Sequence, residues 1–137
     1  MSIIDSYYYL FYKFYRLFEA FDQTRWLTKV KATISVATLE VLMVFSCVNY
    51  WDVFNHQKSN TVFFSLEIVI CIIIIIIILL IKWFVFISND KWKSYVIEFD
   101  QWSKEKNLKG TKITIVITLF IFFNFVVSCI LFSPYRY

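Results

Sequence analysis

The chain has 137 residues, of which 60% are hydrophobic and 22% aromatic, and its formal net charge is +4 at pH 7. A soluble domain of this size is roughly half apolar, so the composition favours a membrane protein. One glycine and one proline leave few turns, which predicts a small number of long elements. The lysines lie between apolar segments and form no basic module, so we expect no binding of nucleic acid.

The types of site that need cysteine or histidine clusters are also excluded by the sequence. Cys47, Cys71 and Cys129 all fall within apolar stretches and form no CxxC pair, so we interpret them as small core residues. His56 is the sole histidine, which rules out a site built on a histidine pair. The sequence has no Gly-rich phosphate loop and no ligand set for heme or an iron–sulfur cluster. We therefore expect neither a metal nor a cofactor.

The first predicted helix covers residues 3–22 and includes IIDSYYYLFYKFYRLFEAF. About 19 residues reach roughly 28 Å as a helix, which is long enough to cross a bilayer. Lys13, Arg16, Glu19 and Asp22 recur every three residues and form a polar stripe. The segment could span the membrane with this stripe turned towards protein, or lie in the interface with its tyrosines at headgroup level. The pattern itself slightly favours spanning.

Three further stretches are long and apolar enough to cross a membrane, since a spanning helix needs about 20 mainly apolar residues. They are residues 32–54, 61–87 and 112–132. In lipid an isolated segment must satisfy its own backbone hydrogen bonds, so even the run of seven isoleucines in 61–87 is predicted to be helical. The predicted fold is all-α: one integral membrane helix bundle over residues 1–137, with three clear transmembrane helices and the N-terminal segment as a fourth.

The positive residues are divided unevenly between the connections. Residues 51–61 hold one lysine and the C-terminal tail holds one arginine, whereas the other twelve precede the first clear span or accompany the connection between the last two. The positive-inside rule places these twelve on the cytoplasmic or matrix side, and the C-terminus on the intermembrane-space or periplasmic side. The twelve are Lys13, Arg16, Arg25, Lys29, Lys31, Lys82, Lys91, Lys93, Lys104, Lys106, Lys109 and Lys112.

The charged connection, residues 88–110, is predicted to contain an amphipathic helix. Trp92, Tyr95, Phe99 and Trp102 recur at helical spacing and trace one face. We interpret this segment as an interfacial or docking helix, since aromatic residues belong at the interface; a ligand site is the less favoured alternative. Gly110 is predicted to stop the helix.

Two carboxylates interrupt the apolar segments. Glu40 lies about eight residues into 32–54, and Glu67 about six residues into 61–87. A carboxylate at mid-membrane costs about 2.5–3.5 kcal/mol on insertion scales, so such residues face a bundle interior, a water path or a proton relay. The alternative is a structural ion pair, and because no lysine lies deep within a span, its partner would come from another chain. Asn124 is expected to form an interhelical hydrogen bond.

The segments ATLEVLMVFSC and FFSLEIVICIIIIIIILLI each place a glutamate after a leucine, in consecutive helices joined by a short outer turn. This pattern resembles chain 4L of respiratory complex I, the small K-type membrane subunit of proton-pumping NADH:quinone oxidoreductases. The resemblance covers residues 3–87 and requires residues 3–21 to span. It implies that Glu40 and Glu67 are proton-relay carboxylates. Residues 88–137 have no counterpart in that family.

The resemblance also implies the surroundings of the chain. Its partners would be the other membrane subunits of the complex and membrane lipid, in a mitochondrial or bacterial inner membrane; the AT-rich amino-acid usage favours an organelle-encoded protein. Two alternatives stay open. The chain could be a structural accessory subunit of a respiratory complex, or a free-standing small inner-membrane protein.

Overall fold

The computed structural model describes residues 3–21, 25–55, 61–88 and 90–132, with side chains in these ranges except at 3, 25–26, 61–68 and 86–88. The described part is all-α, as predicted. Its elements are α1 (Ile3–Phe21), α2 (Arg25–Asn55), α3 (Thr61–Lys82), the π-helical segment η1 (Trp83–Ser88), α4 (Lys91–Asp100) and α5 (Lys104–Phe132). The predicted apolar stretches fall within α2, within α3 and η1 together, and within α5.

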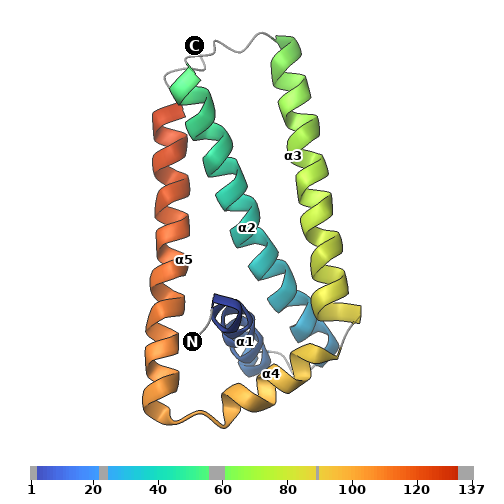
Figure 1. Ribbon diagram of the computed structural model, residues 1–137, viewed down its shortest axis with the longest axis vertical. Coiled ribbons are helices and arrows are strands. Elements are labelled where there is room, and N and C mark those ends of the chain that lie inside the picture. The colour runs from blue at the N-terminus through green and yellow to red at the C-terminus, as the bar shows by residue number, and fades with distance from the viewer. Residues whose placement is uncertain (1–2, 22–24, 56–60, 89, 133–137) are drawn as a thin grey trace.

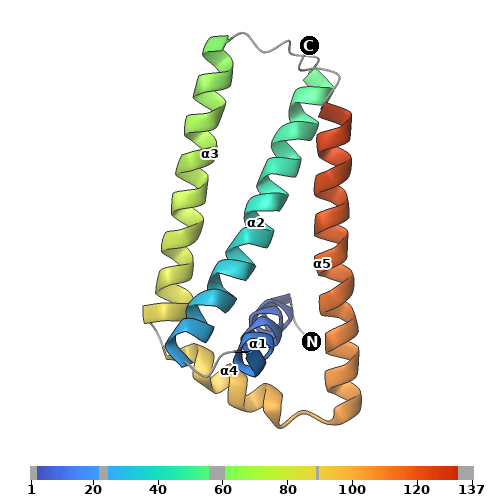
Figure 2. The ribbon, with the colours of Figure 1, turned by 180° about the vertical axis from the view of Figure 1, so that it is seen from behind.

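The three long helices run lengthwise through the molecule, and α2 slants between α3 and α5 (Figures 1 and 2). α2 packs most extensively against α5 and then against α1, while its contact with α3 is smaller. By length and composition, Leu27–Asn55 and Lys104–Phe132 could each cross a membrane, and Val69–Val85 forms a shorter apolar helix among the described residues.

α1 does not run beside the long helices. Figures 1 and 2 show it nearly end-on, lying across the end of the bundle where α4 also lies. Of the two orientations that the sequence left open for residues 3–22, this is the one expected of an interfacial helix. It differs from the arrangement that the resemblance to chain 4L requires, in which this segment spans.

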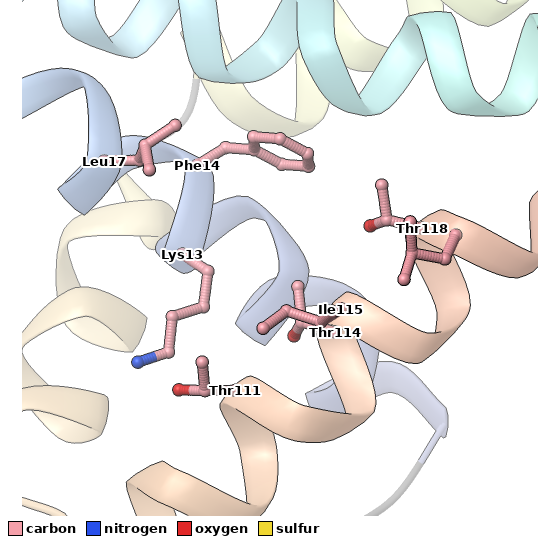
Figure 3. Close-up of a pocket in the computed structure, with 8 residues that line it drawn as sticks. Lys13, Phe14, Leu17, Thr111, Thr114, Ile115 and Thr118 are labelled. Carbon is pink, nitrogen blue, oxygen red and sulfur yellow. The ribbon is translucent and has the colours of Figure 1, made fainter. Parts of the chain in front are cut away.

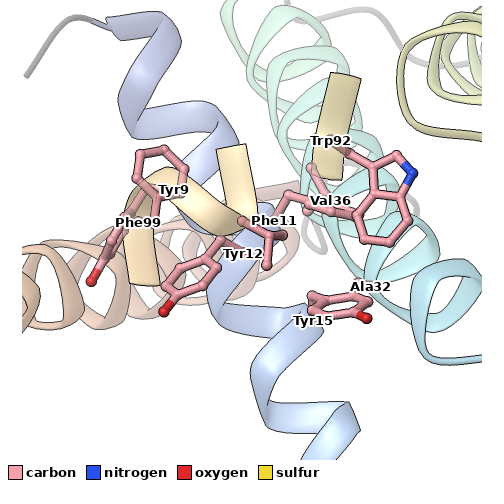
Figure 4. Packing of buried hydrophobic residues seen from close by; sticks show 9 residues of the cluster. Tyr9, Phe11, Tyr12, Tyr15, Ala32, Val36, Trp92 and Phe99 are labelled. Atoms are coloured by element: carbon pink, nitrogen blue, oxygen red, sulfur yellow. The ribbon is translucent and has the colours of Figure 1, made fainter. Parts of the chain in front are cut away.

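An aromatic cluster explains why α1 lies there. Nine residues of α1, α2 and α4 form a buried core at this end (Figure 4). The Tyr9 and Trp102 rings stack with centroids 5.4 Å apart, and the Tyr8 and Tyr95 rings with centroids 3.9 Å apart. Such pairs each contribute about 0.5–1.5 kcal/mol beyond the area that they bury. The members of the core are Tyr9, Phe11, Tyr12, Tyr15, Ala32, Val36, Trp92, Val96 and Phe99.

The face predicted for α4 is confirmed in part. Trp92 and Phe99 are buried together with Val96, whereas Tyr95 is half-buried and Trp102, also half-buried, lies beyond the end of the helix. The predicted end of that helix is wrong: α4 ends at Asp100, and α5 starts at Lys104. The Lys106 N–H donates to Ser103 Oγ at 3.3 Å, so a serine caps the first turn of α5.

Gly110 therefore lies inside α5 rather than at a helix stop. It is buried against Tyr9, and a Cβ at this position would stand 2.5 Å from Tyr9 Cε1 and Cζ. Real Cβ contacts are essentially never this short. The glycine is needed for the close approach of an aromatic ring, which the sequence pattern does not reveal.

The interhelical hydrogen bond predicted for Asn124 is confirmed. The Tyr50 hydroxyl on α2 donates to Asn124 Oδ1 on α5 at 3.0 Å. One helical turn further along, Asn49 Nδ2 donates to Ser128 Oγ at 3.1 Å. These two contacts set the register of α2 against α5 where the side chains around them are apolar.

Replacing Asn124 with leucine is expected to lower the free energy of unfolding by about 1 kcal/mol, because interhelical hydrogen bonds in apolar surroundings contribute about this much. Unfolding by SDS titration in mixed micelles measures the change. The double variant Tyr50→Phe/Asn124→Leu should lose little more than Asn124→Leu alone, and full additivity of the two losses would show that the hydrogen bond contributes nothing.

Candidate functional site

The strongest candidate site is an ion pair between two of the long helices. Lys82 Nζ donates to Glu40 Oε1 at 2.5 Å. The Lys82 side chain is 6% exposed and that of Glu40 is 33% exposed. Glu40 lies near the middle of α2, whereas Lys82 is the last residue of α3. The flexible lysine side chain carries its charge from the end of one helix to the middle of the other.

An aromatic ring also lies close to the ammonium of Lys82. Lys82 Nζ lies 4.1 Å from the centroid of the Tyr7 ring on α1. A cation over an aromatic face gains about 0.5–2 kcal/mol, more when it is removed from water. The pair therefore lies where α1, α2 and α3 meet, and it links α3 to the rest of the bundle.

The expectation that Glu40 would need a partner from another chain is wrong. Lys82 lies near the end of the predicted span 61–87 rather than deep within it, and it is 42 positions from Glu40 in the sequence. The pairing depends on how α2 slants past the end of α3 (Figure 1). No local pattern encodes that crossing.

The structure does not bring the two predicted relay glutamates together. The backbone of Glu67 belongs to α3, and its side chain lies outside the described residues. Glu67 precedes Lys82 by 15 residues, or about 22 Å along a helix axis. Glu40 contacts the last residue of α3, whereas Glu67 lies near the start of that helix. A proton relay between the two glutamates would therefore need further groups between them. Their relay role stays a prediction.

A second cluster of charges joins α1 to α4 at the surface of the molecule. The Arg16 guanidinium pairs with Glu19 on its own helix and with Asp100 on α4. The Tyr12 hydroxyl donates to Asp100 Oδ1 at 2.7 Å. Of the polar stripe predicted for α1, Arg16 therefore contacts the end of α4, and Glu19 pairs with Arg16. Lys13 lies over the Tyr9 and Tyr12 rings of its own helix, and Asp22 lies outside the described residues.

The electrostatic effect on Tyr12 is large. Burial of the phenol, then its hydrogen bond to Asp100 and the charge of that carboxylate, raise the pKa of Tyr12 to about 12, and Arg16 partly offsets the rise. Because the folded pKa lies above the ordinary value of about 10, the associated stabilisation is present below pH 10. It is lost as the pH rises through about 12.

A spectroscopic titration of the tyrosines tests this effect. In the difference between the wild type and Tyr12→Phe, the tyrosinate absorbance is expected to appear with a midpoint near pH 12. Asp100→Asn should move that midpoint towards the ordinary value, because the partner charge is removed. A midpoint near 10 in the wild-type difference would contradict the buried Tyr12–Asp100 contact.

The described residues include no group of three or more His, Cys, Asp or Glu side chains that could hold a metal ion. None of the three cysteines, which all lie within the described residues, forms a disulfide; Cys71 is buried, whereas Cys47 and Cys129 are exposed. The interpretation of the cysteines as core residues therefore holds for Cys71 alone. Cys47 lines a hollow between α2 and α3, and the Cys129 sulfur lies 3.7 Å from Asn49 Nδ2 of α2.

Comparison of the chain with protein-family models, with curated proteins and with solved structures found no match. The resemblance to chain 4L thus depends on the two glutamate-containing segments themselves. The function must be inferred from the Glu40–Lys82 ion pair, from α1 and α4 at the end of the bundle, and from the exposed apolar helices.

Proposed function

We propose that this chain is a polytopic membrane protein with a structural, non-catalytic role, in which α2, α3 and α5 cross the bilayer. In this proposal α1 and α4 form an aromatic layer at its positively charged face. The observation that carries the proposal is the segregation of the molecule into exposed apolar helices and one charged, aromatic end.

The long helices expose large apolar side chains that water would disfavour. In the most apolar 18-residue stretch of α5, only 11% is buried within the chain, and in that of α2 33% is buried. A core helix of a soluble protein would be mostly buried instead. On α3 and α5 the exposed residues include Val69, Ile73, Ile77, Leu80, Val116, Phe120, Phe123 and Ile130. Lipid or another membrane chain would cover these side chains and remove them from water.

The positive residues gather at one end of the bundle. The start of α2, the end of α3, the start of α5 and all of α4 lie there (Figures 1 and 2), and these elements, with α1, hold the twelve lysines and arginines that the sequence predicted to share a side. Aromatic rings of α1 and α4 lie at the same end. Both features are typical of a cytoplasmic membrane interface.

The Glu40–Lys82 pair supports a structural role. The carboxylate of Glu40 is paired with a lysine of its own chain, so the bundle can insert without a basic partner subunit for this residue. The pair also fastens α3, which otherwise has a small contact with α2. The exposed face of α3 then remains for lipid or for neighbouring membrane subunits.

The second candidate is the proton-relay function implied by the resemblance to complex I. One observation favours it: a carboxylate and an amine in contact between apolar helices can exchange a proton. A relay that includes Glu67 would still need groups from other chains to cover about 22 Å.

Purification in mild detergent, with mass spectrometry of the accompanying chains, tests these candidates. If complex I subunits accompany the chain, Glu40→Gln and Glu67→Gln decide between a relay and a structural role. The structural role predicts that both variants leave pumping intact in assembled complexes. Loss of pumping without loss of assembly would establish the relay. Purification without partners would favour the free-standing protein and reject complex I.

A further inference from the structure

A groove lies in the angle between α1 and α5 (Figure 3). Its volume is about 320 Å³, within the range of small-molecule sites. Lys13, Phe14 and Leu17 of α1 line one wall, and the other wall is formed on α5 by Thr111, Thr114, Ile115, Thr118 and Leu119. The exposed walls are almost wholly apolar, and Lys13 is the one charged residue among those that line it.

The groove has a charged end and an apolar end. Thr111 lies near the start of α5, where the lysines gather, and Thr118 lies seven residues further along, about 10 Å deeper. In Figure 3 the Lys13 ammonium points towards the Thr111 end, while Thr118 lies at the opposite end. The groove therefore leads from the charged face of the bundle into the apolar layer.

The Lys13 ammonium has no carboxylate partner among the described residues. It lies 5.2 Å from the Tyr9 ring centroid and 5.4 Å from that of Tyr12, so aromatic faces hold it in place while its charge is left for another group. Lys104 precedes Thr111 by seven residues and so shares its side of α5. The approach to the groove is positive.

We infer that this groove binds one acyl chain of an anionic phospholipid, with the lipid phosphate on Lys13. The inference rests on the proposed membrane placement, in which α1 lies at headgroup level. The apolar walls fit a lipid tail, and a lone cation at the mouth of the groove fits a negative headgroup. A neutral apolar helix in the groove would leave the Lys13 charge without a counter-ion.

Native mass spectrometry of the purified chain in detergent tests the inference. The probes are phosphatidylglycerol and phosphatidylcholine with the same acyl chains. The wild type should bind phosphatidylglycerol about fivefold more tightly, the effect of one lysine near a lipid surface. Lys13→Gln should abolish this preference. Thr118→Trp, which fills the deep end, should weaken the binding of both lipids.

Two controls match these variants. Lys109→Gln removes a lysine, and Ile113→Trp adds an indole; both residues are exposed, neither lines the groove, and each lies two residues from Thr111 and so on the other side of α5. Both controls should keep the wild-type affinities. Equal affinity of the wild type for the two lipids, or equal losses in controls and groove variants, would overturn the inference.

The failure of this inference differs from that of the proposed function. If the chain fractionates with membranes and needs detergent for extraction but shows no preference for phosphatidylglycerol, the groove inference alone is wrong. If the chain remains in solution without detergent, the membrane placement itself is wrong.

Discussion

Replacing Glu40 with alanine is expected to lower the free energy of unfolding by about 3 kcal/mol, since removing one partner of a buried ion pair is strongly destabilising. The variant takes away the carboxylate that lies 2.5 Å from the ammonium of Lys82, whose side chain is only 6% exposed. Lys82→Met should cost less, because it leaves the carboxylate of Glu40, which is a third exposed. SDS titration in mixed micelles, followed by circular dichroism, measures both changes.

The double variant Glu40→Gln/Lys82→Met separates the pair from the packing around it. It should regain most of the stability that Glu40→Ala loses, because neutral side chains of similar length replace both charges. Glu105→Gln, at the exposed start of α5, is the matched control and should lower the free energy of unfolding by only about 0.3–1 kcal/mol, the effect of one carboxylate near a helix N-terminus. If the double variant loses the sum of the losses measured for Glu40→Gln alone and for Lys82→Met alone, Glu40 and Lys82 do not interact.

The second large effect is expected at Gly110. Gly110→Ala should lower the free energy of unfolding by about 1–3 kcal/mol through overpacking, because its Cβ would overlap the Tyr9 ring. The gain in helix propensity, about 1 kcal/mol for alanine over glycine, offsets part of this cost. Gly110→Leu should cost more and release Tyr9 from its hydrogen bonds to Asn107.

A double-mutant cycle tests the origin of that cost. In the background of Tyr9→Ala the ring is gone, so Gly110→Ala should become neutral or stabilising. Lys109→Ala, one residue earlier on an exposed position, controls for the general effect of alanine in this helix. If Gly110→Ala is equally costly with and without the Tyr9 ring, the close approach is not its cause.

Features that depend on local periodicity could be predicted from the sequence. The buried face of α4 follows from aromatic residues at helical spacing, and Asn124 could be assigned to an interhelical contact because a lone amide in an apolar helix needs a partner. Ser103, followed by a lysine- and glutamate-rich turn, is also a capping signal for the start of α5, and it contradicts the prediction of one helix that ends at Gly110.

Features that depend on how helices cross could not be predicted. α1 has a polar stripe that suits either orientation. Its place across the bundle is decided by contacts to α4 and to Trp102 that are 84 to 93 positions away in the sequence. The Lys82–Glu40 pair likewise depends on the slant of α2 past the end of α3. The fit of the Tyr9 ring over Gly110 belongs to the same class, since a glycine near a predicted helix end is equally typical of a stop.

These crossings bear directly on function. The resemblance to chain 4L depends on two short glutamate motifs and requires the first helix to span. The structure lays that helix across the charged end and gives Glu40 its own lysine. Both features fit a self-contained bundle with an interfacial layer better than a relay subunit whose carboxylates depend on neighbouring chains.

Cysteine labelling from each side of the membrane tests the central claim most directly. The three native cysteines are replaced by alanine, and single cysteines are introduced at Ile4, an exposed residue of α1, and at Asn55, the last residue of α2. The proposed architecture predicts that Ile4→Cys reacts with an impermeant maleimide only from the cytoplasmic or matrix side and Asn55→Cys only from the opposite side. Labelling of both positions from the same side would show that α1 spans the membrane and would contradict the account.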